Sequence, residues 1–295
     1  MNQDPSEPNK PTSQGDAEAS HAQGRSEKFP RSQTLPAQTP LFWVQQKDRY
    51  LRQLMIRDIE ETTGRRFLVY FANRFEPNSD IDQRDISLMT EILRDLGNDP
   101  VDIMVETGGG LTDATEALIS LLQNVVGDRR VVIANAAKSN GTLLCLAARS
   151  IVMGATSELG PIEPSVQGVP CSILMSPEIA KQNFPLHMFG VYALQQSRAL
   201  AKRLLSAGMM SGKEETYIDA TVQALASRDK YHSHGSVIDH REAAAMGLSV
   251  DYLAPDSKLW QQIWLLYSMY DYDCRKNRYL KVLEGRAAST AVAAP

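Results

Sequence analysis

The 295-residue sequence contains little cysteine, no long apolar run and no large excess of either charge. Its three cysteines, Cys145, Cys171 and Cys274, are widely spaced and form no CxxC pair. This pattern argues against a disulfide framework or a zinc site and suits a reducing compartment, so we expect a cytoplasmic protein. No stretch of about 18 consecutive apolar residues occurs, so we expect no transmembrane helix. With 31 basic and 35 acidic residues, the chain shows no electrostatic signature of binding to nucleic acid or a membrane surface.

Residues 1–40 differ in composition from the rest of the chain. They hold six of the fifteen prolines, together with many serine and glutamine residues and one aromatic residue, Phe29. Such a segment cannot bury enough apolar surface to offset the entropy lost on ordering, so we predict a disordered tail. It contains no apolar h-region, so we expect no secretory signal. Residues 41–285 are predicted to form one domain, and residues 286–295 a disordered end.

Short β-branched segments alternate along the chain with segments that are apolar at helical spacing. The predicted strands are 66–72, 101–106, 131–135 and 151–153, and the helices between them are 81–96, 111–126 and 143–148. This rhythm is typical of an α/β protein in which helices flank a parallel sheet. An amphipathic helix is predicted over 41–63 and an aromatic-rich helix over 256–284.

Ser139 lies where the chain passes from the third predicted strand, through Ala136 and Ala137, into a helix. A serine at this place can cap the helix by accepting a backbone N–H. It can instead act as a nucleophile, where free N–H groups and the positive helix end favour a developing anion. The local sequence leaves both roles open.

Three consecutive glycines, Gly108, Gly109 and Gly110, follow the strand predicted at 101–106. Glycine allows positive φ and close approach of a backbone to a ligand. The run therefore predicts either a tight turn or an oxyanion site built from bare N–H groups. A phosphate-binding loop is excluded, because neither GxxxxGK[ST] nor GxGxxG can be written through these residues.

Five motifs occur in an order that resembles the Clp-fold serine peptidases. The motifs are IEETTGRRFLVY (59–70), ETGGG (106–110), AAKSNGTLLCLAA (136–148), ELGPIEP (158–164) and a segment that begins at His234 and ends in EAAAMGL (242–248). Within this group the chain looks most like the serine dehydrogenase proteinase family, which is related to signal peptide peptidase A. The resemblance covers roughly Gln45 to Tyr252. It implies a Clp/crotonase-like fold of repeated ββα units.

The resemblance also implies a serine peptidase that hydrolyses peptide bonds. In that family's pattern Ser139 falls on the nucleophile, and the N–H of Asn140 falls on one oxyanion donor. The N–H of Gly109 or Gly110 falls on the other donor. The sequence departs from the pattern at Gly108, where a proline is common; this change loosens the loop but keeps its N–H groups.

The general base is less evident in the sequence. Clp proteases place a histidine beyond the strand that follows the serine helix, but residues 153–169 contain none. The resemblance to signal peptide peptidases implies a lysine from a later helix, and Lys202 is the first candidate. His234 matches a family motif position and is the alternative. Lys138 neighbours Ser139, but adjacent residues point apart.

Two other interpretations stay open. One is a catalytically inactive Clp-fold protein that acts as an oligomeric binding scaffold, and the other is a crotonase-type acyl-CoA enzyme, which would not need Ser139. The resemblance further implies a peptide or protein substrate, no cofactor and a homo-oligomer, either a trimer or a hexamer. The aromatic helix predicted at 256–284 offers a surface for such an assembly. The histidines of residues 232–240 lack metal-ligand spacing, so we expect no metal site.

Overall fold

The computed structural model describes residues 39–94 and 96–295. The predicted tail, apart from its last two residues, lies outside the described residues. The chain divides into two compact units, Met1–Gln46 and Lys47–Pro295. The first unit contributes helix α1 (Pro40–Gln45), so the helix predicted over 41–63 is divided between the two units.

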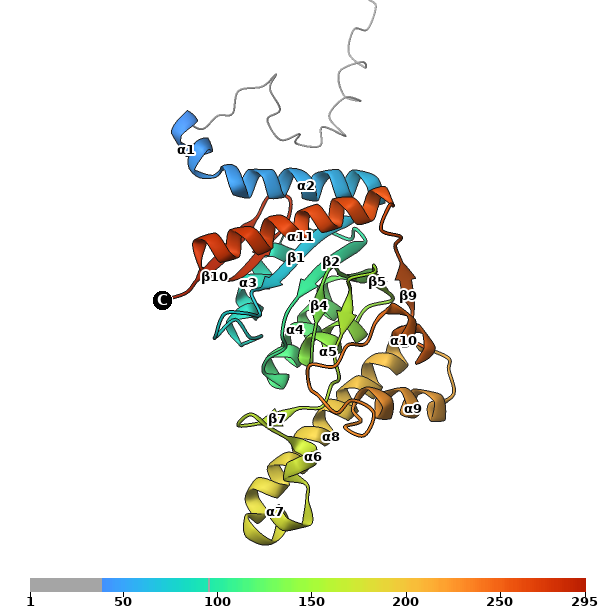
Figure 1. The fold of residues 1–295 in the computed structure, drawn as a ribbon. Coiled ribbons are helices and arrows are strands. Elements are labelled where there is room, and N and C mark those ends of the chain that lie inside the picture. Colours follow the sequence, from blue (N-terminus) through green and yellow to red (C-terminus); the bar gives the residue numbers. More distant parts are fainter. Residues whose placement is uncertain (1–38, 95) are drawn as a thin grey trace, which may run out of the picture. The chain divides into compact units, whose positions relative to one another are not determined.

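A seven-stranded sheet forms the centre of the second unit (Figure 1). Its strands are β1 (Arg66–Ala72), β2 (Val101–Glu106), β3 (Arg129–Ile133), β5 (Ile151–Met153), β9 (Val250–Tyr252), β10 (Tyr279–Glu284) and β11 (Ser289–Ala293). Across the sheet they follow the order β11-β10-β1-β2-β3-β5-β9. The five strands from β1 to β9 in this order run parallel, whereas β10 is antiparallel to both β1 and β11. The predicted α/β class is therefore confirmed.

Helices cover both faces of this sheet. One face carries α2 (Lys47–Thr63) and α11 (Lys258–Asn277), which lie side by side (Figure 1). The core on the other face is built with α3 (Arg84–Leu93), α4 (Thr112–Val125), α5 (Asn140–Leu146), α8 (Phe184–Ala207), α9 (Glu215–Leu225) and α10 (His240–Ala245). The remaining elements are β4 (Ala136–Ala137), β6 (Glu158–Leu159), β7 (Ser165–Val166), β8 (Val169–Pro170), α6 (Cys171–Leu174) and α7 (Pro177–Gln182). Among the helices of the described residues, none combines the length and the apolar character needed to cross a bilayer.

Strand β1 shows why the strands of the main sheet are apolar at nearly every position. Successive side chains of a strand point to opposite faces of the sheet. Accordingly Leu68 and Tyr70 belong to the core that α3 covers, whereas Val69 and Phe71 belong to the core beneath α2 and α11. Since both faces are buried, every position along the strand favours an apolar residue.

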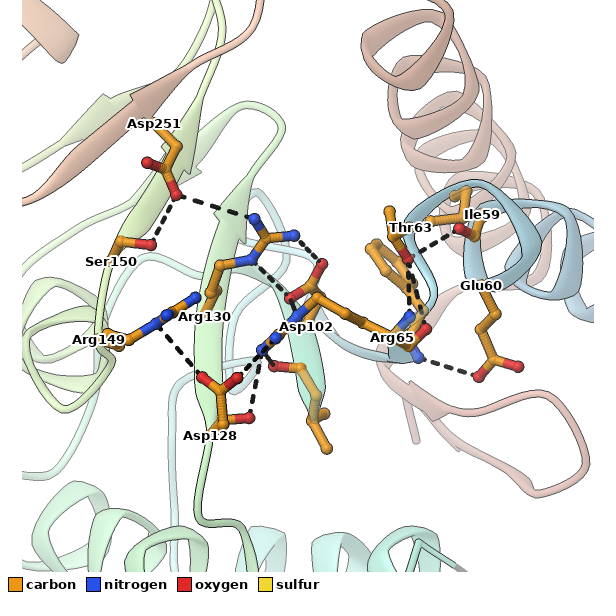
Figure 2. A network of polar contacts seen from close by, with 12 residues as sticks. Ile59, Glu60, Thr63, Arg65, Asp102, Asp128, Arg130, Arg149, Ser150 and Asp251 are labelled. Atoms are coloured by element: carbon orange, nitrogen blue, oxygen red, sulfur yellow. Dashed lines mark hydrogen bonds and ion pairs between the residues drawn. The ribbon is translucent and has the colours of Figure 1, made fainter. Parts of the chain in front are cut away.

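A charged network holds the amino ends of the parallel strands together (Figure 2). Asp102, at the start of β2, is almost fully buried. Its carboxylate accepts hydrogen bonds from Arg65 Nε at 2.6 Å and from Arg130 Nη2 at 2.6 Å. Arg65 also reaches Asp128 at 2.8 Å, and Arg130 lies 3.9 Å from Asp251. This end of the sheet is therefore fixed by ion pairs, and the opposite, carboxyl end carries the glycines and Ser139.

The end of the chain differs from the sequence prediction. The helix predicted over 256–284 stops at Asn277, because Arg278 takes a left-handed conformation with φ 55°. The following residues form β10, and the predicted disordered end, 286–295, is wrong because it contains β11. Strand β11 consists of small residues, and its order comes from backbone pairing with β10, which the side-chain pattern does not reveal.

A buried ion cluster fixes α2 and α11 to β10. Arg52 of α2 donates from Nε to Glu284 of β10 at 2.7 Å and from Nη1 to Asp273 of α11. The hydroxyl of Tyr270 also donates to Glu284, at 2.5 Å. All four side chains are buried, so each charge depends on its partners for the solvation that water would otherwise give.

Replacing Arg52 by methionine should destabilise the protein strongly. The change leaves the carboxylates of Asp273 and Glu284 buried without their cation, a loss that typically costs about 3–5 kcal/mol. Urea unfolding followed by circular dichroism measures this change. An Arg52→Met protein with an unchanged free energy of unfolding would show that the cluster does not hold these elements together.

Candidate active site

Ser139 has a backbone conformation that few non-glycine residues adopt. It follows β4 and Lys138 and immediately precedes α5, with φ 54° and ψ −119°. Such a conformation is costly, and it is typical of functional sites where surrounding structure enforces it. Ser139 occupies the N-cap position of α5, but its hydroxyl makes no capping hydrogen bond. The capping interpretation is therefore not supported, and within the described part of the chain this hydroxyl has no hydrogen-bond partner.

The glycine run lies directly against Ser139. A Cβ atom added to Gly109 would sit 2.8 Å from the Cβ of Ser139 and 3.3 Å from the backbone nitrogen of Asn140. On its other edge the run pairs with Ile81, whose N–H donates to Gly109 O at 2.8 Å. Leu111 N–H donates in turn to Ile81 O at 2.9 Å. The glycines are thus a short strand between Ile81 and the serine.

This pairing determines where the groups of Gly110 point. In a parallel ladder, the residue between the two bonded residues turns its own N–H and C=O to the opposite side. Accordingly the carbonyl of Gly110 accepts a hydrogen bond from Asn140 Nδ2 at 2.5 Å. Its N–H faces the same side, toward the start of α5.

Two of the three predicted oxyanion donors are free. Gly109 N–H donates to the hydroxyl of Thr107 at 3.1 Å. By contrast, the N–H groups of Gly110 and Asn140 enter none of the hydrogen bonds formed among residues 39–94 and 96–295. The structure therefore brings all three predicted residues beside Ser139 and leaves Gly110 and Asn140 as the open pair.

Strand pairing carries the loop that contains His234 to the same place. Strand β4, just before Ser139, pairs in parallel with β6. The last residue of β6, Leu159, forms an antiparallel bridge with Ile238: Leu159 N–H donates at 2.9 Å and Ile238 N–H returns a bond at 3.0 Å. Strand β6 therefore lies between Ile238, at the end of the loop, and β4, which leads to the serine.

Lys138 joins these segments through its buried side chain. Its Nζ donates to Leu159 O at 3.2 Å and to Ser236 O at 3.1 Å, and it lies 3.2 Å from the carboxylate of Glu158. Burial lowers the pKa of Lys138, and the Glu158 carboxylate opposes that shift. Because its ammonium is engaged with the loop, Lys138 serves to hold the loop, as expected for a residue that points away from its neighbour Ser139.

His234 is a half-buried imidazole that feels the charge of a buried carboxylate, Glu163. Burial lowers the pKa of His234 below its ordinary value, the charge of Glu163 opposes this, and Arg228 and Lys138 reinforce it. Glu163 itself is 3% exposed and accepts hydrogen bonds from Ser172 N–H at 2.9 Å and from Arg228 at 3.4 Å. A neutral imidazole near a fixed carboxylate has the properties of a general base at neutral pH.

Glu106 connects the end of β2, which leads into the glycine run, to β4, which leads to Ser139. Its carboxylate accepts hydrogen bonds from Ala136 N–H at 2.8 Å, from Arg74 Nε at 3.1 Å and from Asn135 Nδ2 at 3.2 Å. Burial raises the pKa of Glu106 to about 7 despite these donors. This residue thus fixes the end of β2 to the start of β4.

Lys202 lies in a different environment from the one predicted. Its Nζ sits between two carboxylates of α9, 2.6 Å from Glu215 and 2.7 Å from Asp219. The hydrogen bonds that the Lys202 ammonium donates to Asp219 and Glu215 raise the pKa of Lys202, whereas a general base must lose its proton easily. No hydrogen bond or ion pair among the described residues joins Lys202 to Ser139, so this environment argues against Lys202 as the base.

Sequence reasoning missed two features of the site. Ile81 was placed at the start of a helix, although it pairs with Gly110 and α3 begins only at Arg84. Lys138 was set aside as a neighbour of Ser139, although its side chain fixes the histidine loop. Gly160 is the sequence feature that fits the position of the Lys138 side chain, because a Cβ at residue 160 would lie 2.7 Å from Lys138 Cδ.

The carboxyl edge of the parallel sheet presents a serine hydroxyl without a hydrogen-bond partner among the described residues and two free N–H groups, which is the geometry of a serine hydrolase with a backbone oxyanion hole. The family follows from comparison with known proteins. Residues 80–261 match the family described as ClpP-like SDH-type serine proteinase, and the chain belongs to it. The resemblance drawn from the sequence motifs is therefore confirmed.

Two curated relatives come from Methanocaldococcus jannaschii, and both are named as uncharacterized proteins. MJ0137 is 25% identical over 186 residues, which cover 60% of this chain and 60% of MJ0137. MJ1495 is 32% identical over 76 residues, 26% of each chain. The chain thus spans less than two thirds of the length of either relative. A solved ClpP1 mutant from Listeria monocytogenes is 15% identical, with a TM-score of 0.42, over 70% of this chain and 99% of that one.

Replacing Gly110 by alanine should reduce kcat about 100-fold or more, the usual effect of losing one oxyanion donor. The new Cβ would lie 2.3 Å from Ile81 N, and Gly110 has a φ of +154°, which side chains rarely adopt. Steady-state hydrolysis of a fluorogenic peptide measures the effect. Gly127→Ala is the matched control, because a Cβ there meets nothing within 4 Å and should leave kcat unchanged. Equal rates in the two variants would contradict the oxyanion assignment.

Proposed function

We propose that the protein is a serine peptidase in which Ser139 attacks the carbonyl carbon of a peptide bond. One observation supports this proposal above all. Ser139, at the start of α5, has a strained backbone and a hydroxyl without a hydrogen bond to any described residue, and it lies beside the free N–H groups of Gly110 and Asn140. A residue that only capped a helix would use its hydroxyl for the cap. Gly109 supports the arrangement by allowing the glycine strand to contact the serine.

We assign the base to His234 and the orienting carboxylate to Glu163. His234 accepts the proton of the Ser139 hydroxyl as the Oγ–carbon bond forms, and the carbonyl oxygen becomes an anion bonded to Gly110 and Asn140 N–H groups. The imidazolium then gives this proton to the leaving amine as the C–N bond breaks. Water hydrolyses the acyl-serine by the same steps. The buried Glu163 carboxylate stabilises the imidazolium formed on the way.

Peptides or proteins are the proposed substrates, and no cofactor takes part in these steps. We also infer that the protein acts as a homo-oligomer, a trimer or a hexamer. Helix α11 supports this only in part: Trp260, Tyr267 and Tyr270 are buried in the chain's own core, whereas Trp264, Leu265 and Tyr272 are exposed. Further support comes from exposed apolar side chains around α6 and the start of α8: Val169, Ile173, Met175, Phe184, Phe189 and Tyr192.

Replacing Ser139 by alanine should abolish both peptide hydrolysis and labelling by a fluorophosphonate probe. The melting temperature should change little, because the hydroxyl makes no cap that could be lost. A capping serine would instead give a loss of about 1 kcal/mol with activity retained. Retained hydrolysis in a clean preparation of the variant would exclude Ser139 as nucleophile. A wild-type protein that neither hydrolyses nor labels would favour the inactive binding scaffold.

The pH dependence of kcat/KM should identify the base. His234 must be neutral to accept a proton, and burial lowers its pKa, so the rate should fall only below about pH 6.5. His234→Ala should cut the rate at least 100-fold, and Lys202→Arg should leave it unchanged. Glu106→Gln is the control for the other group that titrates near neutrality. If Glu106→Gln no longer showed the fall of kcat/KM at low pH, or if His234→Ala hydrolysed peptide at the wild-type rate, the assignment would be contradicted.

A further inference from the structure

The position of the glycine strand depends on Ile81. Both backbone hydrogen-bonding groups of Ile81 are used in the pairing, with Gly109 O at 2.8 Å and Leu111 N at 2.9 Å. A Cβ on Gly110 would lie 2.3 Å from Ile81 N and 2.4 Å from Ile81 O, so the two backbones are in close contact. Any shift of Ile81 must therefore move the N–H of Gly110 relative to Ser139.

A buried ion cluster fixes the residues that follow Ile81. Lys281 of β10 is 1% exposed, and its Nζ lies 3.0 Å from Asp82 and 2.8 Å from Asp85. The same Asp85 carboxylate accepts the backbone N–H of Asp82 at 3.0 Å and the hydroxyl of Tyr70 at 2.7 Å. The exposed Arg84 also pairs with Asp82, at 2.7 Å, from the solvent side.

Stability alone does not account for a charged residue at this place. Replacing a buried ion pair by apolar side chains of similar volume is often neutral or stabilising. The neighbouring residues of β10, Leu280, Val282 and Leu283, are buried and apolar, as expected for a strand in the sheet. An ion cluster, unlike an apolar contact, has a fixed geometry, because each hydrogen bond has a preferred direction.

We propose that Lys281 is a positioning residue for the oxyanion strand: through Asp82 and Asp85 it holds Ile81, and through Ile81 it aims the N–H of Gly110 at the reacting carbonyl. Within the described residues, Lys281 itself forms no hydrogen bond or ion pair with Ser139 or with any residue of the glycine run. Its effect is transmitted by two backbone hydrogen bonds. The kinetic part of this inference rests on the proposed peptidase function, and the structural part does not.

The Arg52 cluster is a matched control within the same strand. Each cluster contains one buried basic side chain, two carboxylates and one tyrosine hydroxyl, and each is anchored on β10. The two clusters lie on opposite faces of the sheet. Side chains alternate along β10, so Lys281 shares a face with Leu283, and Glu284 shares the other face with Val282. Leu283 and Val282 belong to different cores. Only the Lys281 cluster adjoins Ile81, because its member Asp82 follows Ile81 directly in the chain. Arg52→Met thus removes a comparable cluster without disturbing the oxyanion strand.

The test compares Lys281→Met with Arg52→Met by amide hydrogen exchange and kinetics, using the full chain. Lys281→Met should speed exchange at least tenfold in peptides that cover residues 79–83 and 107–112, where Ile81 and Leu111 donate their bonds. Arg52→Met, which destabilises the whole fold, should give no increase in these peptides beyond the increase that it gives elsewhere in the sheet. In hydrolysis assays Lys281→Met should lower kcat about 10–100-fold with KM within threefold, below the full effect of deleting an oxyanion donor. Arg52→Met should keep kcat within twofold.

The outcomes separate this inference from the proposed function. If the wild-type protein shows no hydrolysis, the peptidase proposal fails, and the exchange comparison still decides whether Lys281 holds the strand. Equal exchange at 79–83 and 107–112 in the two variants would overturn the inference, as would an unchanged kcat in Lys281→Met. If Lys281→Met does not fold, Asp82→Asn replaces it. That variant keeps the Lys281–Asp85 pair and should give the same selective increase in exchange, with a smaller fall in kcat.

Discussion

The site depends on one steric constraint: the glycine strand fits between two backbones that leave no room for a side chain. On one side Gly109 lies against Ser139, and on the other Gly110 lies against Ile81. Close contact on both sides fixes the strand laterally, while its free N–H groups stay turned toward the serine. Oriented dipoles of this kind stabilise a developing anion without having to reorganise during the reaction. The strained backbone of Ser139 persists because these neighbours enforce it.

Backbone pairing delivers the other groups to this strand. Strand β4 carries Ser139, β6 pairs with β4, and the bridge to Ile238 adds the histidine loop as a third segment. Buried polar side chains then hold these segments together. Glu106 accepts a hydrogen bond from β4, and Lys138 donates hydrogen bonds to both β6 and the loop. Because the interior has a low dielectric constant, each of these partners strengthens the others as long as all are satisfied. The site is thus a short secondary sheet placed at the edge of the main one.

The sequence allowed the local part of the site to be predicted and left the distant part undetermined. Ser139, Asn140 and the glycines lie within short motifs, and the resemblance to the Clp-fold serine peptidases implied that these motifs meet. The environment of Lys202 did not, since it is set by Glu215 and Asp219 on another helix. Strand β11 escaped prediction because a paired edge strand needs little side-chain burial. Tertiary contacts that join residues far apart in the chain leave no periodic signal in the sequence.

The pairing of β1 with β10 has a consequence for the time at which the proposed site can be complete. Val69 pairs with Glu284, so this contact cannot form until the ribosome has made all of the residues between them. Lys281 lies on β10 and is synthesised after Ser139, His234 and every residue of the glycine run. At roughly 5–20 residues per second, its synthesis follows that of Ser139 by about 7–28 s. On the proposed function, the nascent chain carries Ser139 throughout that interval without the lysine assigned to position the glycine strand, and therefore without a complete oxyanion site.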